Sequence, residues 1–110
     1  MNKPTVLGKQ STSRTLVRTS VANGCLTIQI SGRFDFNCHR DFRLAYEGSG
    51  PMNEYVVDLK DADYLDSSAL GMLLVLREER EPARVRVVNC RPAVRRILEI
   101  ASFQNLFSLE

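Results

Sequence analysis

The sequence predicts an α/β domain: a mixed β-sheet of four to five strands with an N-terminal hairpin, packed with three to four helices. Three observations lead to this fold class. An Asn23-Gly24 pair separates two short apolar segments, which is a strong hairpin signal. After residue 50, segments of strand length alternate with helical ones, which predicts parallel strands joined by crossover helices. The chain has 110 residues, 44% of them hydrophobic, enough for one core without disulfide bonds.

The N-terminal part divides into a tail and a hairpin. Residues 1–13 are rich in Thr, Ser, Lys, Pro and Gly and predict a flexible tail, so that the folded domain covers residues 14–110. Strands are expected over Thr15–Ser20 and Cys25–Ser31. In the second strand apolar and polar residues alternate, so one face should be buried. The apolar members are Leu26, Ile28 and Ile30.

The next predicted elements are a helix and a central strand. A helix over Phe34–Tyr46 would place Cys38, Phe42, Ala45 and Tyr46 on one face, with Asn37 as its N-cap. The segment Gly48-Ser49-Gly50-Pro51 breaks the chain. Tyr55–Leu59 is almost continuously apolar, which is typical of a central strand covered on both faces.

A helix from about Ser67 to Glu79 is apolar around nearly its whole circumference. Surface helices normally show only an apolar stripe. Either this helix is buried nearly all round, or some of its residues, with Met72 and Val75 as the candidates, reach the surface and contact a partner. Gly71 inside the helix costs up to about 1 kcal/mol relative to Ala, so we expect a neighbouring element or a partner to approach it closely.

The C-terminal third continues the alternation. Pro82 ends the preceding helix, and a strand of Val85, Val87 and Val88 follows. Arg91-Pro92 starts a helix with proline in its permitted first turn. The inner face of that helix is expected to hold Val94, Ile97, Leu98 and Ala101, and a short strand is expected around Leu106–Leu109.

Two hydroxyls stand at the start of the leucine-rich helix, directly after Asp66. Asp and Ser are common helix N-caps, and capping alone explains one of these three residues. An anion on Ser67 or Ser68 would also be stabilised there, because first-turn amides and the helix dipole are positive. A serine in this position can therefore act as a phosphorylation switch.

Residues 55–74, YVVDLKDADYLDSSALGMLL, resemble the signature of the STAS domain and, within it, of the bacterial anti-sigma-factor antagonists. The signature combines an apolar strand, an acidic loop, Asp-Ser-Ser, a small residue, Leu-Gly and an apolar helix. Weaker resemblance extends to residues 26–35 and 85–107. Ala69 departs from the pattern, since many members carry Gly there.

The resemblance implies a phosphorylation-controlled switch between partners. Ser67 corresponds to the serine that is phosphorylated in the family, with Ser68 as the alternative, and Asp66, Asp63 and Asp61 form its surroundings. The unphosphorylated form would bind an anti-sigma factor, or a serine kinase of the partner-switching type, and so free a sigma factor. The phosphorylated form would release this partner, and a PP2C-like phosphatase could restore the unphosphorylated form. The expected partner contacts are Asp35, Ser68, Ala69, Gly71, Met72 and Val75.

Several function classes receive no support from the sequence. The net charge of +2 is too mild to require a nucleic acid, and the basic cluster of Arg84, Arg86, Arg91, Arg95 and Arg96 is interpreted as a solvated face, with an acidic protein partner as the functional alternative. No apolar run approaches the roughly 20 residues that span a bilayer, and a signal-peptide core is absent, so we expect a cytoplasmic protein without membrane insertion.

Catalysis and metal binding are equally unsupported. Cys25, Cys38 and Cys90 are widely spaced and predict neither a disulfide framework nor a metal site. No nucleotide-binding motif occurs, and His39 is the only histidine that could activate a serine. We therefore expect no enzyme and no cofactor. Two other roles remain: a standalone STAS subunit of an ABC-type lipid transport complex, and a scaffold of a stress-signalling assembly.

Overall fold

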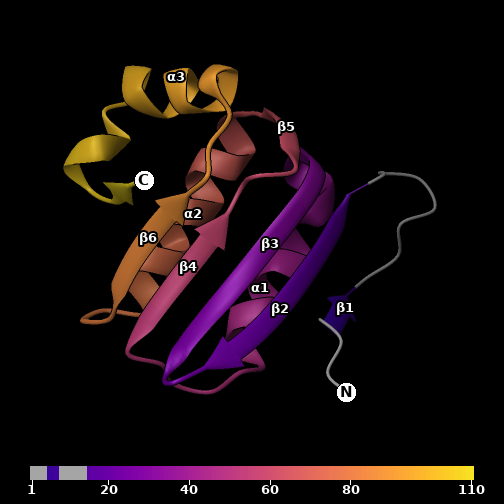
Figure 1. The fold of residues 1–110 in the computed structure, drawn as a ribbon, viewed down its shortest axis with the longest axis vertical. Helices are drawn as coiled ribbons and strands as arrows, with labels where there is room; N and C mark the ends of the chain where they lie inside the picture. Colours follow the sequence, from indigo (N-terminus) through magenta and orange to yellow (C-terminus); the bar gives the residue numbers. More distant parts are fainter. Residues whose placement is uncertain (1–4, 8–14) are drawn as a thin grey trace.

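The computed structural model describes residues 5–7 and 15–110 and confirms the predicted fold class. Its described residues form a mixed sheet with the strand order β1-β2-β3-β4-β6-β7, and β5 pairs with β3 beside this path (Figure 1). The strands are β1 Thr5–Leu7, β2 Leu16–Ala22, β3 Cys25–Phe34, β4 Glu54–Asp58, β5 Ala62–Leu65, β6 Arg84–Val88 and β7 Ser108–Leu109. The helices are α1 His39–Glu47, α2 Ser67–Glu79 and α3 Pro92–Ile100, with short 3-10 turns η1 Phe36–Cys38 and η2 Phe103–Asn105.

The hairpin forms where the sequence predicts it. Strands β2 and β3 pair antiparallel, with Ala22 opposite Cys25. Asn23 and Gly24 both have positive φ angles, 54° and 76°, as a two-residue turn of the type favoured in hairpins requires. Strands β1 and β2 also pair antiparallel, and the remaining pairs are parallel. The antiparallel and parallel portions of the sheet therefore meet at β3.

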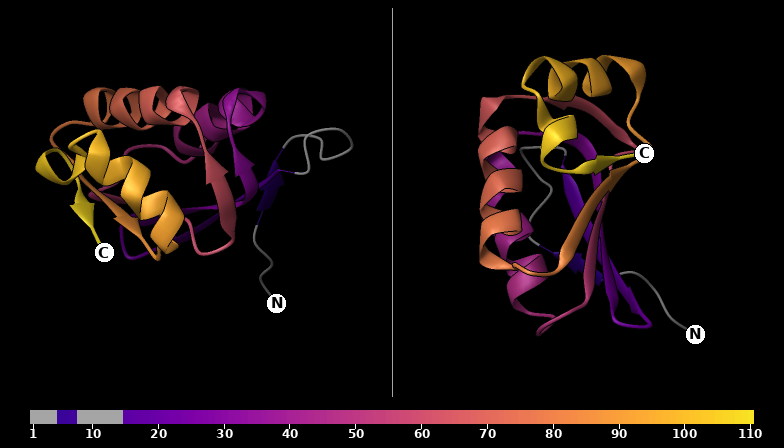
Figure 2. Two further views of the ribbon diagram at one scale, coloured as in Figure 1. Left: turned by 90° about the horizontal axis from the view of Figure 1, so that it is seen from above. Right: turned by 90° about the vertical axis from the view of Figure 1, so that its left-hand side faces the viewer.

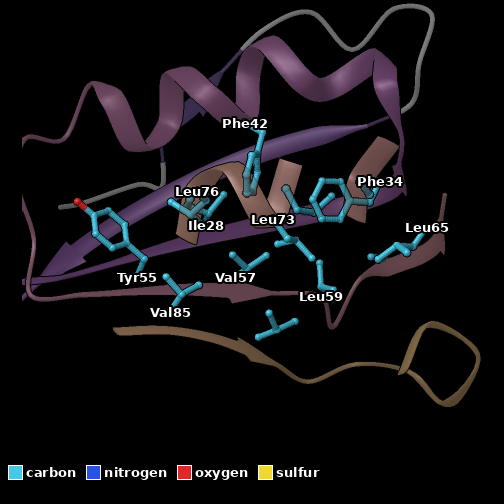
Figure 3. Packing of buried hydrophobic residues seen from close by; sticks show 14 of the residues in the cluster. Ile28, Phe34, Phe42, Tyr55, Val57, Leu59, Leu65, Leu73, Leu76 and Val85 are labelled. Atoms are coloured by element: carbon cyan, nitrogen blue, oxygen red, sulfur yellow. The ribbon is translucent and has the colours of Figure 1, made fainter. Parts of the chain in front are cut away.

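Helices α1 and α2 cover the same face of the sheet, whereas α3 lies across one end of it (Figure 2). The core lies between that face and the two helices (Figure 3). Ile28 and Val57 reach it from the sheet, and Phe42, Leu73 and Leu76 reach it from the helices; all five are at most 1% exposed. Fully burying such side chains stabilises the fold by about 1.5–3 kcal/mol each.

Strand β5 was not predicted. Ala62–Leu65 pairs with the last residues of β3, and the register shifts between Gly32 and Arg33. The carbonyl of Asp61 accepts a hydrogen bond from the amide of Gly32 at 2.9 Å. Only Ala62 and Leu65 of this strand are buried, so the sequence shows little of the apolar pattern that marks a strand. This strand connects the end of β3 to the start of α2.

Strand β1 also differs from the prediction. It consists of three residues of the expected flexible tail and pairs antiparallel with β2. The rest of that tail, residues 1–4 and 8–13, lies outside the described residues. The last helix differs slightly as well, because Val94 and Leu98 are buried as expected but Ala101 is exposed and follows the helix end.

The start of α1 corrects the prediction of a helix from Phe34 with Asn37 as N-cap. Asp35 is the capping residue of η1, because its Oδ1 atom accepts a hydrogen bond from the amide of Asn37 at 3.0 Å. An Asp side chain that bonds a nearby backbone amide in this way favours a turn or a cap over the interior of a helix. The α-helix begins only at His39. The expected inner face is confirmed, since Cys38, Phe42, Ala45 and Tyr46 are all buried.

Candidate functional site

The start of α2 is capped by Asp66. Its Oδ1 atom accepts a hydrogen bond from the amide of Ala69 at 3.1 Å, and its own backbone is extended, with a φ angle of −118°. The amide of Asp66 also donates to the carbonyl of Phe34 at 3.4 Å, which fixes the helix start to the end of β3. Because Asp66 supplies the cap, neither serine is needed for it.

The two serines differ in exposure. Ser67 is the first residue of α2 and is exposed, whereas Ser68 is half-buried. Neither hydroxyl makes a hydrogen bond to any residue that the structure describes. Ser67 is therefore accessible at the surface, and the described part of the chain offers neither serine the hydrogen-bonded histidine that a catalytic nucleophile would need.

The segment that leads into α2 carries the predicted carboxylates and contacts a cation. Asp61 and Asp63 are both exposed. The guanidinium of Arg33 lies 4.0 Å from the centre of the Tyr64 ring on β5, and its Nε atom is 3.2 Å from Oδ2 of Asp35. Sequence reasoning missed Arg33, because the ring that it contacts, Tyr64, lies on a strand that was not predicted.

An apolar groove of about 330 Å³ lies between α1 and α2 and extends to Ser68. It is lined by Phe36, His39, Phe42, Arg43, Tyr46, Ser68, Gly71, Met72 and Val75. The face of α2 that lines the groove is thus partly open to solvent, since Val75 is 41% exposed and Met72 is half-buried. Of the two alternatives for this helix, burial nearly all round is therefore wrong.

Gly71 is one of the groove residues. A Cβ atom built on it would meet nothing within 4 Å. The expected close approach by a neighbouring element is therefore wrong within the described chain, because α2 turns this residue toward the groove and not toward the sheet. Approach by a partner stays a prediction.

Two of the expected partner contacts are buried. Ala69 is 0% exposed and packs in the core, since it lies on the same side of α2 as Leu73 and Leu76. Asp35 is 8% exposed and is engaged in its bonds to Asn37 and Arg33. The Ala69 side chain is thus covered by the chain itself, whereas that of Asp35 is 11% exposed, and a partner contact by either residue stays a prediction. Ser68, Gly71, Met72 and Val75 all line the groove.

Sequence reasoning also missed Phe36. This residue is 62% exposed, and its ring stacks on that of His39 with the centroids 4.6 Å apart. Asp35 fixes the η1 turn that presents it. A signal was available, because helical spacing places Phe36 off the face formed by Cys38 and Phe42. Large exposed aromatic residues are common anchors of protein interfaces.

The basic cluster is mostly paired within the chain. Arg86 contacts Glu54 and Glu110 at 2.8 and 2.7 Å, and Arg95 contacts Glu99 at 2.9 Å. Arg91 donates to the carbonyl of Lys60. These contacts support the interpretation of a solvated face.

The cysteines are free thiols, and burial raises the pKa of Cys38 to about 12. Within residues 5–7 and 15–110, no three His, Cys, Asp or Glu side chains are grouped as a metal ion would require. Over the same residues, none of the helices has the length and hydropathy needed to cross a membrane.

A family model described as "Mlab, STAS domain" matches residues 17–108. A STAS-domain containing protein of Pseudomonas aeruginosa (strain UCBPP-PA14) is 56% identical over 87 residues, which cover 76% of this chain and 86% of the relative. The family model spans nearly all of the described sheet and helices, including the start of α2 and the groove.

Solved structures share the fold. An anti-sigma factor antagonist from Mycobacterium paratuberculosis aligns with a TM-score of 0.77 and 20% identity, over 90% of this chain and 87% of that one. The anti-sigma factor antagonist SpoIIAA in its unphosphorylated form aligns with a TM-score of 0.64 and 16% identity, over 86% of each chain. A sulfate transporter family protein from Wolinella succinogenes aligns with a TM-score of 0.69 and 13% identity, over 81% of this chain and 75% of that one. At these identities the likeness concerns the fold alone.

Proposed function

The chain belongs to the STAS domain family, and we propose that it is an anti-sigma-factor antagonist controlled by phosphorylation of Ser67. The observation that carries this proposal is that Asp66 and Ser67 have different roles at the start of α2. Asp66 caps the helix, which leaves the exposed Ser67 hydroxyl without a structural task. The apolar groove that a partner could occupy begins at the next residue, Ser68.

Phosphorylation would oppose docking through charge. A phosphate adds about −1.5 to −2 charges at neutral pH, directly beside the Asp66 carboxylate and close in sequence to Asp63 and Asp61. Like charges and the desolvation of the phosphate would both disfavour a protein docked on this surface. A loss of about 3 kcal/mol weakens binding on the order of a hundredfold. The positive end of α2 tolerates the phosphate, so release does not require unfolding.

Exposure favours Ser67 over Ser68 as the modified residue. A kinase must reach the hydroxyl, and Ser67 is exposed whereas Ser68 is half-buried in the groove wall. A phosphate on Ser68 would fill the groove itself and block it sterically. The chain is the substrate of this reaction and not its catalyst, because ATP, metal and catalytic base would come from the partner kinase. A PP2C-like phosphatase would restore the binding form.

Phosphopeptide mapping of the full chain, purified from its native host with phosphatase inhibitors, tests the site. We expect modification at Ser67. Modification at Ser68 alone would move the assignment by one residue, and an unmodified chain under all growth conditions would overturn the switch.

Binding assays with the anti-sigma protein test the consequence. We expect Ser67→Ala to bind constitutively and Ser67→Glu to bind about a hundredfold more weakly, if glutamate reproduces most of the charge effect. Ser20→Glu is the matched control, because Ser20 is exposed on β2 and pairs with Thr27, toward the end of β3 that is remote from Phe34. Equal binding by Ser67→Glu and Ser20→Glu would contradict the mechanism.

The description of the matching family model favours a second candidate function. It names Mlab and no antagonist, so we also consider a standalone STAS subunit of an ABC-type lipid transport complex. Such a subunit would use the same face of α2 constitutively. Co-purification with a transporter ATPase, unaffected by Ser67→Glu, would support this role over the switch. A large homotypic complex would instead support the scaffold of a stress-signalling assembly.

A further inference from the structure

The groove between α1 and α2 has the composition of a small-molecule site. Its volume of about 330 Å³ lies at the lower end of the range of such sites. Small-molecule sites are lined mostly by apolar and aromatic side chains, with a few polar groups that fix the orientation of the ligand. The groove follows this pattern, because six of its lining residues are apolar, aromatic or glycine: Phe36, Phe42, Tyr46, Gly71, Met72 and Val75.

The charges near the groove are compensated within the chain. Among the described residues that line it, Arg43 is the one with a permanent charge. Its Nε atom lies 2.8 Å from Oε2 of Glu47, and the charge of Glu79 also acts on it. Glu79 in turn accepts a hydrogen bond from the hydroxyl of Tyr46 at 3.1 Å. A charged ligand would therefore lose water here without gaining a free counter-ion, whereas an uncharged ligand avoids that cost.

Ser68 supplies one free polar group where the groove meets the start of α2. It is half-buried, and its hydroxyl makes no hydrogen bond to any residue that the structure describes. A serine hydroxyl both donates and accepts hydrogen bonds, so it can pair with an uncharged polar group such as an alcohol. The other polar residue of the lining, His39, stacks its ring on that of Phe36.

The apolar part of the groove is open to a ligand. Phe36 and Val75, at 62% and 41% exposure, leave apolar surface that water must otherwise cover. A Cβ atom built on Gly71 would meet nothing within 4 Å, so the backbone of α2 is accessible between these side chains. Covering this surface with an apolar molecule is favourable in proportion to the area removed from water.

We propose that the groove between α1 and α2 is a binding site for an uncharged apolar small molecule that carries one hydrogen-bonding group, as an aliphatic alcohol does. The apolar body lies against Phe36, Met72 and Val75, and the polar group bonds to the hydroxyl of Ser68. This site goes beyond the proposed function and does not depend on phosphorylation of Ser67. Where both hold, the ligand competes with the protein partner for the same face of α2.

Three probes with one alkyl chain test the charge of the ligand. 1-Octanol, octanoate and octylammonium differ only in the end group. Each is titrated into the full chain at pH 8, above the usual titration range of histidine, and the backbone amide shifts are followed by NMR. We expect saturable shifts at Gly71 and Met72 with octanol, and at least about tenfold weaker binding of both ions. From hexanol to octanol, each added methylene should tighten binding about fourfold.

Three results would each overturn the site. The first is equal or tighter binding of either ion, because the groove would then select charge. The second is a set of shifts confined to residues outside the groove. The third is the absence of saturable binding by octanol.

A groove-filling variant locates the ligand. Gly71→Leu places a side chain in the open space, and leucine is a good helix former, so we expect the fold to be retained and octanol binding to weaken at least about tenfold. Glu78→Leu is the matched control, because Glu78 is exposed on the same helix and does not line the groove. Equal affinities of the two variants would overturn the location. Circular dichroism of each variant checks the fold.

A second variant tests the polar contact. Ser68→Ala removes the hydroxyl and should weaken octanol binding about two- to tenfold, the range of one hydrogen bond. Ser20→Ala is the control, because Ser20 is exposed on β2 and does not line the groove. An unchanged affinity of Ser68→Ala would overturn the assigned hydrogen bond.

The ligand site and the switch can fail separately. If octanol binds in the groove but the chain is never phosphorylated at Ser67 or Ser68, the switch is wrong and the ligand site stands. If phosphorylation of Ser67 releases the anti-sigma protein but octanol does not bind, the switch stands and the ligand site is wrong.

Discussion

Replacing Gly71 by alanine tests whether this glycine serves contact with a partner or is required by the fold. Gly71 lies inside α2, its φ angle is not positive, and a Cβ atom would meet nothing within 4 Å. Glycine in a helix interior costs about 0.5–1 kcal/mol relative to alanine. We therefore expect Gly71→Ala to raise the free energy of unfolding by about 0.5–1 kcal/mol, which for a domain of this size raises Tm by about 2–6 °C.

The same substitution should weaken binding. The added methyl group projects into the groove that Met72 and Val75 also line. A partner packed closely there would have to shift, at a cost of about 1–3 kcal/mol, or about five- to a hundredfold in affinity. Urea unfolding measures the stability, and fluorescence anisotropy with the labelled anti-sigma protein measures the affinity.

Gly24→Ala is the control for the stability measurement. Gly24 has a φ angle of 76°, and a Cβ atom there would lie 2.8 Å from Nδ2 of Asn53. The left-handed conformation costs an alanine about 1–2 kcal/mol, so this variant should be less stable than the original chain. The reasoning is refuted if Gly71→Ala is destabilised as well, because α2 would then pack closely at Gly71.

Three further substitutions test the core, the cap and the buried thiol. Leu73→Ala removes a side chain that is 0% exposed and should lower the free energy of unfolding by about 2–5 kcal/mol in urea, whereas Leu74→Ala, at 39% exposure, should lower it far less; equal losses would contradict the assigned core. Asp66→Ala should cost about 1 kcal/mol in thermal melts and Asp66→Asn almost nothing, because asparagine also caps helices; a similar loss in both would show that the charge matters more than the cap. Burial raises the pKa of Cys38 from 9.0 to about 12, so its stabilising contribution is complete below pH 9 and is lost as the pH rises toward 12. Urea unfolding at pH 8 and pH 10 should therefore show a smaller decrease in stability for Cys38→Ala than for the original chain, and an unchanged decrease would contradict the burial of that thiol.

The elements predicted correctly are those whose signals are local. Asn23-Gly24 supplies the two positive φ angles of the hairpin turn, and no distant contact is needed to see this. Helix α2 was expected from about Ser67 to Glu79 and has these bounds, because a capping aspartate precedes it and Pro82 follows it. The parallel portion of the sheet followed from the alternation of strands and helices.

The errors arise where non-local contacts decide the structure. Strand β5 exists because it pairs with the end of β3, some thirty residues earlier in the chain, and only two of its residues show an apolar signal. A local contact was missed as well: the carboxylate of Asp35, predicted to meet a partner, bonds to Arg33 and to the amide of Asn37, each two residues away. Ala69 was interpreted in the same way, but α2 turns it toward the core.

The sequence by itself determined the family resemblance, the order of the main elements and the position of two serines at the start of a helix, since all of these are written in consecutive residues. The tertiary structure decided that Ser67 is exposed, that Gly71 faces open space and that Phe36 borders a groove. The physical reason is that exposure depends on where α1 packs beside α2. That placement is set by the burial of side chains such as Phe42 and Leu73 from separate parts of the chain, and no local pattern records it.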